Sequence, residues 1–186
     1  MKLQTKRLIL RPFAKGDISN IVENINNLKV TKWLLVVPYP YKRKDAIWWV
    51  ENCKEKAKAK PRKDYNFGIE LKEEHKIIGG IGLHRVNKNN GTAELGYWLG
   101  EKYWRQGYGS EALENLINFA FNKLKLRRLG AEVFAENPSS GKLLEKYGFK
   151  REGLKRQAQI CKADGKIKDE ILYGLLRKEY KVTRKI

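Results

Sequence analysis

A short glycine-containing loop has the residue types and spacing best suited to chemistry. The loop reads Trp104-Arg105-Gln106-Gly107-Tyr108-Gly109-Ser110. It directly precedes a segment whose apolar residues recur at helical spacing. The first N–H groups of a helix have no partner within the helix and lie at the positive end of its dipole, so they can bind a phosphate. We therefore expect these residues to bind a cofactor that carries phosphate groups.

Two strands and a helix must position this loop. Aromatic and branched side chains predict a strand over 91–99, helical spacing predicts a helix over 107–124, and a second strand is expected over 129–135. A strand–helix–strand crossover makes the two strands parallel neighbours. Ligands of such sheets bind beyond the carboxyl ends of the strands, which is where the loop lies.

Other phosphate-binding loops fit the sequence less well. A dinucleotide fingerprint would place Ala112 at its third glycine, which is tolerated, but its acidic residue, expected about twenty residues further on, would fall among the basic residues 125–128. A Walker-type loop needs a Gly-Lys-Ser or Gly-Lys-Thr sequence, which does not follow these glycines. The loop is therefore neither a nicotinamide site nor a P-loop.

Three segments, taken in order, resemble the GNAT superfamily of N-acetyltransferases, and more narrowly its branch that acetylates the N-termini of ribosomal proteins. The segments are 5–13, 94–113 and 137–149, the last followed by Glu152-Gly153. One position departs from the general superfamily pattern, because Trp104 stands where glutamine or arginine is usual. This change costs little, since backbone N–H groups hold the phosphates.

The resemblance implies a fold and a cofactor. The expected fold is α/β, a mixed and mostly antiparallel sheet whose central parallel strands splay apart, with helices on both faces. The cofactor is acetyl-CoA, whose pantetheine arm would pair with the backbone of the strand at Tyr97, Trp98 and Leu99. The acetyl group would pass directly to a primary amine in a ternary complex, so no cysteine nucleophile is needed.

The resemblance also implies roles for individual side chains. Glu94 is the expected base, directly or through water, although it could equally be a structural carboxylate. Ser140 is expected to bind the cofactor and to protonate the leaving thiolate, with Asn137 as a further cofactor ligand. Asn137 could instead cap the helix expected over 138–146. The tyrosine acid of many superfamily members is replaced by Leu144, so solvent could supply the proton.

The acceptor side of the site is less defined. Tyr39 and Tyr41, in a proline-containing loop, are expected to line an acceptor cleft, although packing alone would explain them. His75 and His84 are interpreted as surface or strand residues, and no metal site is expected.

The remaining elements complete the expected layout. Strands are predicted over 6–13, 65–72, 76–85, 149–160 and 168–178, and helices from about residue 17 to 26, over 30–35 and over 45–58. We expect a single domain over 1–186.

Charge is the unusual feature of the composition. The chain has 40 Lys and Arg against 21 Asp and Glu, a net charge of +19. This surface is either simply solvated or attracts anions such as coenzyme A, ribosomal RNA or an acidic protein, and it disfavours polycationic acceptors. Neither a membrane span nor a signal peptide is expected, and two cysteines form no obvious disulfide framework. We expect a cytoplasmic monomer or homodimer.

These observations predict an acetyl-CoA-dependent N-acetyltransferase that acts on a protein N-terminus, most plausibly of a ribosomal protein. An α-amine, with a pKa of about 8, needs only a modest base. Two alternatives stay open: an acetyltransferase of small amines such as antibiotics, polyamines or amino acids, and a non-catalytic basic module that binds RNA or the ribosome.

Overall fold

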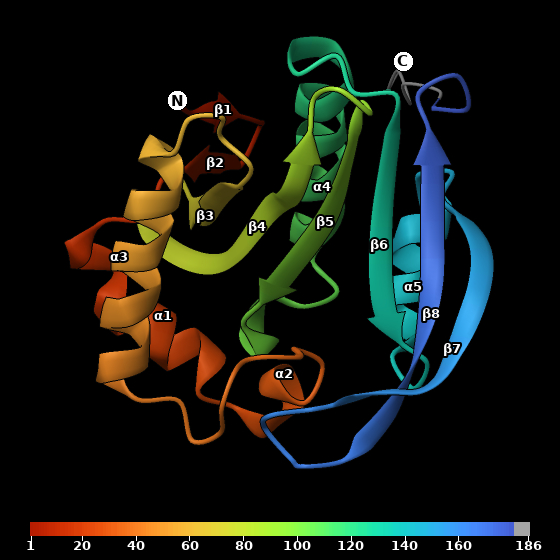
Figure 1. Ribbon diagram of the computed structural model, residues 1–186. Helices are drawn as coiled ribbons and strands as arrows, with labels where there is room; N and C mark the ends of the chain where they lie inside the picture. Colours follow the sequence, from red (N-terminus) through yellow and green to blue (C-terminus); the bar gives the residue numbers. More distant parts are fainter. Residues whose placement is uncertain (181–186) are drawn as a thin grey trace.

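The fold is built on one open sheet of eight strands (Figure 1). The computed structural model describes residues 1–180; residues 181–186, part of the domain expected over 1–186, lie outside the described residues. The strands are β1 (Leu3–Gln4), β2 (Leu8–Arg11), β3 (Tyr65–Leu71), β4 (Lys76–Asn87), β5 (Thr92–Leu99), β6 (Arg128–Phe134), β7 (Lys150–Ile160) and β8 (Ile167–Leu176). Their order across the sheet is β1-β2-β3-β4-β5-β6-β8-β7.

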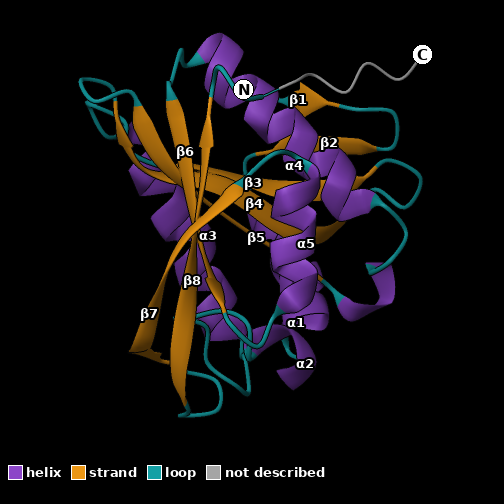
Figure 2. Cartoon of the chain, turned by 90° about the vertical axis from the view of Figure 1, so that its right-hand side faces the viewer, coloured by secondary structure: helices purple, strands orange, loops and turns teal. Residues whose placement is uncertain are grey.

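Helices cover both faces of this sheet. The α-helices are α1 (Ile18–Ile25), α2 (Leu28–Thr31), α3 (Arg43–Lys58), α4 (Tyr108–Asn118) and α5 (Pro138–Lys146). Short 3-10 helices are η1 (Lys15–Asp17) and η2 (Glu101–Tyr103), and η3 (Phe119–Lys123) is a π-helix. Figure 2 shows α4 and α5 together on one side of the sheet. No helix among residues 1–180 combines the length and apolar character that crossing a membrane requires.

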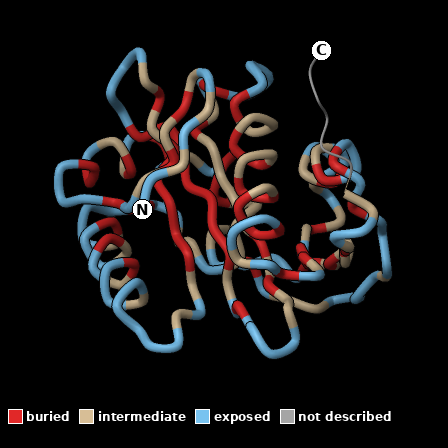
Figure 3. The backbone as a smooth tube through the Cα atoms, turned by 90° about the horizontal axis from the view of Figure 1, so that it is seen from above, coloured by how far each residue is buried: buried red, intermediate tan, exposed pale blue. Residues whose placement is uncertain are grey.

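Two apolar clusters hold the layers together, one on each face of the sheet. The larger cluster joins the central strands to α4 and α5 and includes Phe67, Leu116 and Leu144. The smaller one packs α1 and α3 against the other face through Ile21 and Val50. Figure 3 shows the buried residues concentrated in the central strands and the exposed ones on the outer loops.

The central strands β5 and β6 are parallel neighbours, which confirms the expected crossover. They pair only near their amino ends, where Thr92 lies opposite Arg128 and Glu94 opposite Gly130. Every other pair of neighbouring strands is antiparallel. Beyond Glu94 the two strands diverge (Figure 1). The mixed, splayed sheet expected from the resemblance is therefore present.

Several element boundaries differ from the predictions. The strand expected over 6–13 is shorter, because Thr5 forms a tight turn in which its hydroxyl accepts a hydrogen bond from the Leu8 N–H at 2.9 Å, so that β1 folds back on β2. The helix expected over 30–35 is α2, which begins earlier because the Asn27 side chain caps it by accepting a hydrogen bond from the Lys29 N–H. The helix expected to reach residue 124 is α-helical only to Asn118 and continues as η3.

Candidate active site

A cleft of about 540 Å³ opens where β5 ends and α4 begins. Its walls include most of the residues predicted to bind the cofactor: Tyr97, Trp98, Leu99, Trp104, Arg105, Gly107, Tyr108, Gly109, Ser110, Asn137 and Ser140. Gln106 is outside this lining, because its side chain turns back and donates a hydrogen bond to the Lys102 carbonyl at 2.7 Å. Nearly all of the predicted cofactor residues therefore share one cleft.

The loop before α4 has the backbone shape of a phosphate cradle. Gly107 has a φ of +82°, in the left-handed region that glycine adopts without strain. The hydrogen bond from the Glu111 N–H to the Gly107 carbonyl, at 3.0 Å, closes the first turn, so the N–H groups of residues 108–110 come before it and can bind an anion. The residues present therefore fit the pyrophosphate of coenzyme A.

The N-terminal segment anchors this loop. The carboxylate of Glu111 accepts hydrogen bonds from the Arg7 N–H at 2.8 Å, from Arg7 Nε at 2.7 Å and from the Thr5 hydroxyl at 2.5 Å. Arg7 Nη1 also donates to the Gln106 carbonyl at 2.9 Å. Burial raises the pKa of the Glu111 carboxyl, but the hydrogen bonds from Thr5 and Arg7 outweigh burial and leave the pKa lowered. We call this arrangement of Thr5, Arg7 and Glu111 the loop anchor.

The end of β5 is joined to the loop by a tryptophan. Trp104 Nε1 donates a hydrogen bond to the Leu99 carbonyl at 2.8 Å. The indole therefore occupies one backbone acceptor of the strand segment predicted to pair with pantetheine. It holds the start of the loop against β5, a role for this side chain that the resemblance did not suggest.

A pair of hydroxyl groups bridges the gap between β5 and α5. Ser140 Oγ donates a hydrogen bond to the Tyr97 hydroxyl at 3.0 Å, and the Tyr97 hydroxyl lies 3.3 Å from the Ser140 carbonyl, to which it can donate. Asn137 caps α5 by accepting a hydrogen bond from the Ser140 N–H, as one of its two interpretations predicted. Burial raises the pKa of Tyr97 to about 12. The Tyr97 hydroxyl therefore stays protonated at neutral pH.

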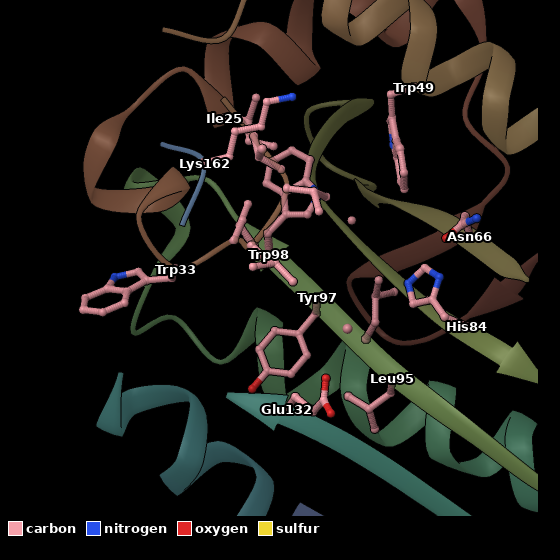
Figure 4. A pocket seen from close by; sticks show the side chains of 18 of the residues that line it. Ile25, Trp33, Trp49, Asn66, His84, Leu95, Tyr97, Trp98, Glu132 and Lys162 are labelled. Carbon is pink, nitrogen blue, oxygen red and sulfur yellow. The ribbon is translucent and has the colours of Figure 1, made fainter. Parts of the chain in front are cut away.

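A second cavity, of about 730 Å³, meets the cofactor cleft at this bridge. Figure 4 shows part of its lining, including Tyr97 and Trp98. Tyr97, Trp98, Asn137 and Ser140 line both spaces. The walls of the second cavity are rich in aromatic side chains, which include Phe13, Trp33, Tyr41, Trp48, Trp49, Phe67, Trp98 and Phe134. Tyr41 lines the cavity as expected, whereas the Tyr39 side chain is exposed at the surface and is not part of its wall. We call this space the acceptor cavity.

Glycines form part of the wall of the acceptor cavity on β4 and β5. Gly80, Gly82 and Gly96 line it. A Cβ on Gly80 would stand 2.6 Å from Trp98 Nε1, and a Cβ on Gly82 would stand 2.9 Å from Asn66 Oδ1. Larger residues would displace these side chains, so the glycines give the cavity its depth.

Glu94, the predicted base, lies where β5 and β6 part. Its carboxylate occupies the space that a side chain on Gly130 would need. Within the described residues 1–180, Glu94 is part of the wall of neither the cofactor cleft nor the acceptor cavity. Burial, reinforced by the nearby Glu132, raises the pKa of the Glu94 carboxyl.

Two acceptor-cavity residues escaped the sequence interpretation. Glu132 of β6 and His84 of β4 both line the cavity (Figure 4). His84 Nδ1 lies 3.1 Å from Asp64 Oδ1. His84 is a strand residue, as interpreted, but its place on the cavity wall has no local sequence signal, because Asp64 lies twenty positions away. Only the antiparallel pairing of β3 with β4 brings the two side chains together.

The splayed parallel strands, the phosphate cradle and the adjoining acceptor cavity define an acetyl-CoA-dependent acetyltransferase. The sequence agrees: residues 7–150 match the acetyltransferase (GNAT) domain. The chain belongs to this family, it is an N-acetyltransferase, and its acetyl donor is acetyl-CoA.

Three relatives give the range of similarity. The chain is 34% identical to the uncharacterized N-acetyltransferase p20 of Bacillus licheniformis over 96% of this chain and 97% of the relative. It is 38% identical to the ribosomal-protein-serine acetyltransferase of Escherichia coli over 88 residues, 47% of this chain and 49% of the relative. The structure of a GNAT-family acetyltransferase from Bacillus anthracis superimposes with a TM-score of 0.81 at 27% identity, covering 96% of this chain and 100% of that one.

Proposed function

We propose that this enzyme acetylates the N-terminal α-amine of a protein, with ribosomal proteins as the first candidates. The observation that carries this proposal is the acceptor cavity, whose wall is rich in aromatic side chains and which meets the cofactor cleft at the Tyr97–Ser140 bridge. Such a cavity suits an acceptor that presents one amine at the junction and apolar groups behind it.

The charges around the acceptor cavity support an acceptor with a single cation. Its lining contains two acidic residues, Asp45 and Glu132, and two lysines, Lys56 and Lys162. A polyamine would need several carboxylates along its length to compensate its charges. The net charge of +19 disfavours such a polycation further.

The similarity to the Escherichia coli ribosomal-protein-serine acetyltransferase supports the same choice. It covers only half of each chain. The similarity favours a protein as the first class of acceptor to test. It does not indicate which residue stands at the N-terminus of that protein.

The bridge supports a way of handling the leaving group. Acetyl-CoA supplies an activated thioester, and the departing sulfur carries negative charge that a hydrogen bond can stabilise. With a pKa of about 12, the Tyr97 hydroxyl holds its proton more tightly than an ordinary thiol with a pKa of about 8.5. Tyr97 therefore acts as a hydrogen-bond donor to the sulfur when its single proton turns from the Ser140 carbonyl toward the thioester. Ser140 Oγ donates to the Tyr97 oxygen, orients it and is the predicted route of the proton.

The test is acetyl transfer to a panel of acceptors. Peptides with free N-termini that differ in their first two residues, the same peptides with blocked N-termini but a free lysine, and small amines including spermidine are compared by thiol release and mass spectrometry. We expect transfer to free N-termini, with a preference for an apolar second residue. Transfer confined to small amines or to lysine side chains would overturn the proposal.

A cavity variant provides the matched control. Trp49→Ala enlarges the acceptor cavity, of which Trp49 is one wall, and leaves the cofactor cleft intact. The expected result is a changed order of preference among peptides with an unchanged Kd for acetyl-CoA. An identical order of preference would indicate that the acceptor binds elsewhere.

A further inference from the structure

A histidine and an aspartate form a pair on the wall of the acceptor cavity. His84 Nδ1 lies 3.1 Å from Asp64 Oδ1, and the His84 side chain is 35% exposed. A carboxylate can only accept a hydrogen bond, so Nδ1 carries the proton of the neutral ring and Nε2 keeps a free lone pair. The pair thus presents a base whose tautomer is fixed.

The backbone directs the His84 ring toward the reacting strand. A Cβ on Gly96 of β5 would stand 3.8 Å from His84 Nε2, so the free nitrogen lies beside the glycine next to Tyr97. The β4–β5 pairing becomes irregular directly after His84, where Arg85 has a φ of +51°. Irregularities of this kind turn side chains out of the regular alternation and are common beside active sites.

The charged groups around the ring come from four elements. Asp64 precedes β3, Lys56 of α3 lies 3.6 Å from Asp64, Arg85 follows on β4, and Glu94 is the partner of His84 across the β4–β5 register. Because directly opposed residues of an antiparallel pair share a face, His84 and Glu94 point to the same side of the sheet. In the part of the chain that the structure describes, His84 lines the acceptor cavity and Glu94 does not.

We propose that His84, held by Asp64, is the base that deprotonates the acceptor amine. The acceptor enters as an ammonium ion and gives one proton to His84 Nε2, which frees the nitrogen lone pair. The nitrogen then forms a bond to the thioester carbonyl carbon while the carbon–sulfur bond breaks and its electrons leave with the sulfur. The nitrogen's second proton goes to the sulfur, and His84 returns the first to solvent.

This role deepens the proposed function and rests on it. Histidine is the side chain that most often serves as a general base, and an α-ammonium group, with a pKa of about 8, releases its proton more readily than a lysine side chain, with a pKa of about 10.4. Asp64 acts as a positioning residue, which fixes the tautomer and stabilises the imidazolium that forms.

The test is the pH profile of kcat/KM for acetyl transfer, measured from pH 5.5 to 9.5 with the best acceptor from the panel. We expect His84→Gln, which keeps the size of the side chain but cannot take the proton, to lower kcat/KM about 100-fold and to remove the acid limb that belongs to the enzyme, so that only the ionisation of the amine itself, at a pKa of about 8, shapes the profile. His75→Gln, which changes an exposed residue between β3 and β4, is the matched control and leaves the profile unchanged. The Kd for acetyl-CoA stays within twofold in both variants.

A second readout does not depend on turnover. The chain has two histidines, so the C2 proton resonance of His84 is assigned by its absence from the His84→Gln spectrum. The midpoint of its titration should coincide with the midpoint of the acid limb of kcat/KM. Asp64→Asn should displace both midpoints together, which a purely structural contact would not do.

Three outcomes separate this inference from the proposed function. A His84→Gln enzyme that keeps its activity and its acid limb on peptide substrates overturns the inference alone. Loss of the acid limb in Glu94→Gln instead would return the role of base to Glu94. If only small amines accept the acetyl group, the proposed function fails. The pH profile of kcat/KM for wild type and His84→Gln, measured with such an amine, then still tests whether His84 is the base.

Discussion

The hydroxyl bridge between Tyr97 and Ser140 joins the two halves of the site at the scale of single residues. Each hydroxyl comes from a different side of the splayed strands, and both line the cleft and the cavity. We propose that the bridge takes the place of the tyrosine acid that the resemblance leads one to expect on α5, where the fully buried Leu144 stands instead. A phenol held by its neighbour therefore lies where the thiolate is expected to form.

Removing the Tyr97 hydroxyl separates stabilisation of the sulfur from cofactor binding. We expect Tyr97→Phe to lower kcat about 10- to 100-fold, because a hydrogen bond to developing charge is worth roughly 1.5–3 kcal/mol. The Kd for acetyl-CoA should change less than threefold. Ser140→Ala should lower kcat by a smaller factor, and stopped-flow single-turnover rates check both values. A Tyr97→Phe enzyme with a normal single-turnover rate would contradict this role.

Gly109 allows a second prediction at this scale. A Cβ at this position would stand 3.4 Å from Leu143 Cδ2 and Leu99 Cδ1, an ordinary contact, whereas the further methyl groups of valine would project among the cleft residues. Gly109→Val should therefore raise the Kd for acetyl-CoA more than tenfold, and Gly109→Ala should raise it less than threefold. Isothermal titration measures both. Equal binding by the two variants would place the phosphates elsewhere.

The loop anchor acts at the scale of elements, because it ties the segment before β2 to α4 across a hundred residues of sequence. Because hydrogen bonds hold the pKa of Glu111 below its ordinary value, its contribution to stability is present above pH 4.5 and is lost as the pH falls through the lowered pKa. At neutral pH the anchor also fixes the carbonyl of Gln106, directly before the phosphate cradle.

Glu111→Gln should therefore destabilise the fold in a pH-dependent way. Weakening charge-assisted hydrogen bonds costs roughly 1.5–3 kcal/mol at pH 7, which corresponds to a fall in Tm of about 3–10 °C for a chain of this size. The difference from the wild type should shrink as the pH falls through the lowered pKa of Glu111. Thermal melts over this range measure it, and a difference that does not depend on pH would contradict the assigned charge. Glu114→Gln, on the same helix, is the control.

At the scale of elements, local sequence patterns predict some features of the site and not others. The phosphate loop, the parallel crossover and the α5 cap follow from glycine spacing, apolar periodicity and Asn137-Pro138, all of which are local signals. The Asp64–His84 pair, the loop anchor and the bridge join residues that lie 20 to 106 positions apart. No local pattern specifies these contacts, since the first depends on the β3–β4 register and the other two on how α4 and α5 pack against the strands. Tyr39 and Tyr41 are a further example. They lie two positions apart in one loop, but Tyr39 is exposed and Tyr41 is buried.

Charge belongs to the scale of the whole molecule. The net charge of +19 creates a field that attracts anions over about 10 Å at 0.1 M salt. Near the cofactor cleft the field is strengthened by Lys29, Lys32 and Arg105, which line it. Coenzyme A is itself a polyanion, so part of its association is steered by this field.

Salt should therefore slow the capture of acetyl-CoA. Raising NaCl from 50 to 500 mM is expected to lower kcat/KM for acetyl-CoA several-fold, with a smaller change in kcat. Acetyl-dephospho-CoA, which has fewer negative charges, is the control and should show a shallower slope. Equal slopes for the two donors would indicate that the charge serves another partner, such as ribosomal RNA, which filter binding with labelled RNA would detect.

The glycines on β4 and β5 have a consequence for how this enzyme can diversify. Gly80 and Gly82 line only the acceptor cavity, whereas the phosphate cradle belongs to α4 and the loop before it. A side chain on Gly80 would press on Trp98, which both spaces share, and one on Gly82 would press on the Tyr65 carbonyl. A small side chain on Gly96, whose Cβ would stand 3.8 Å from His84, would reshape the space for the incoming amine without meeting a residue of the cofactor cleft. New acceptors can thus be acquired by substitutions at a few positions, with the acetyl supply conserved, so that selection can act on the two halves of the reaction separately.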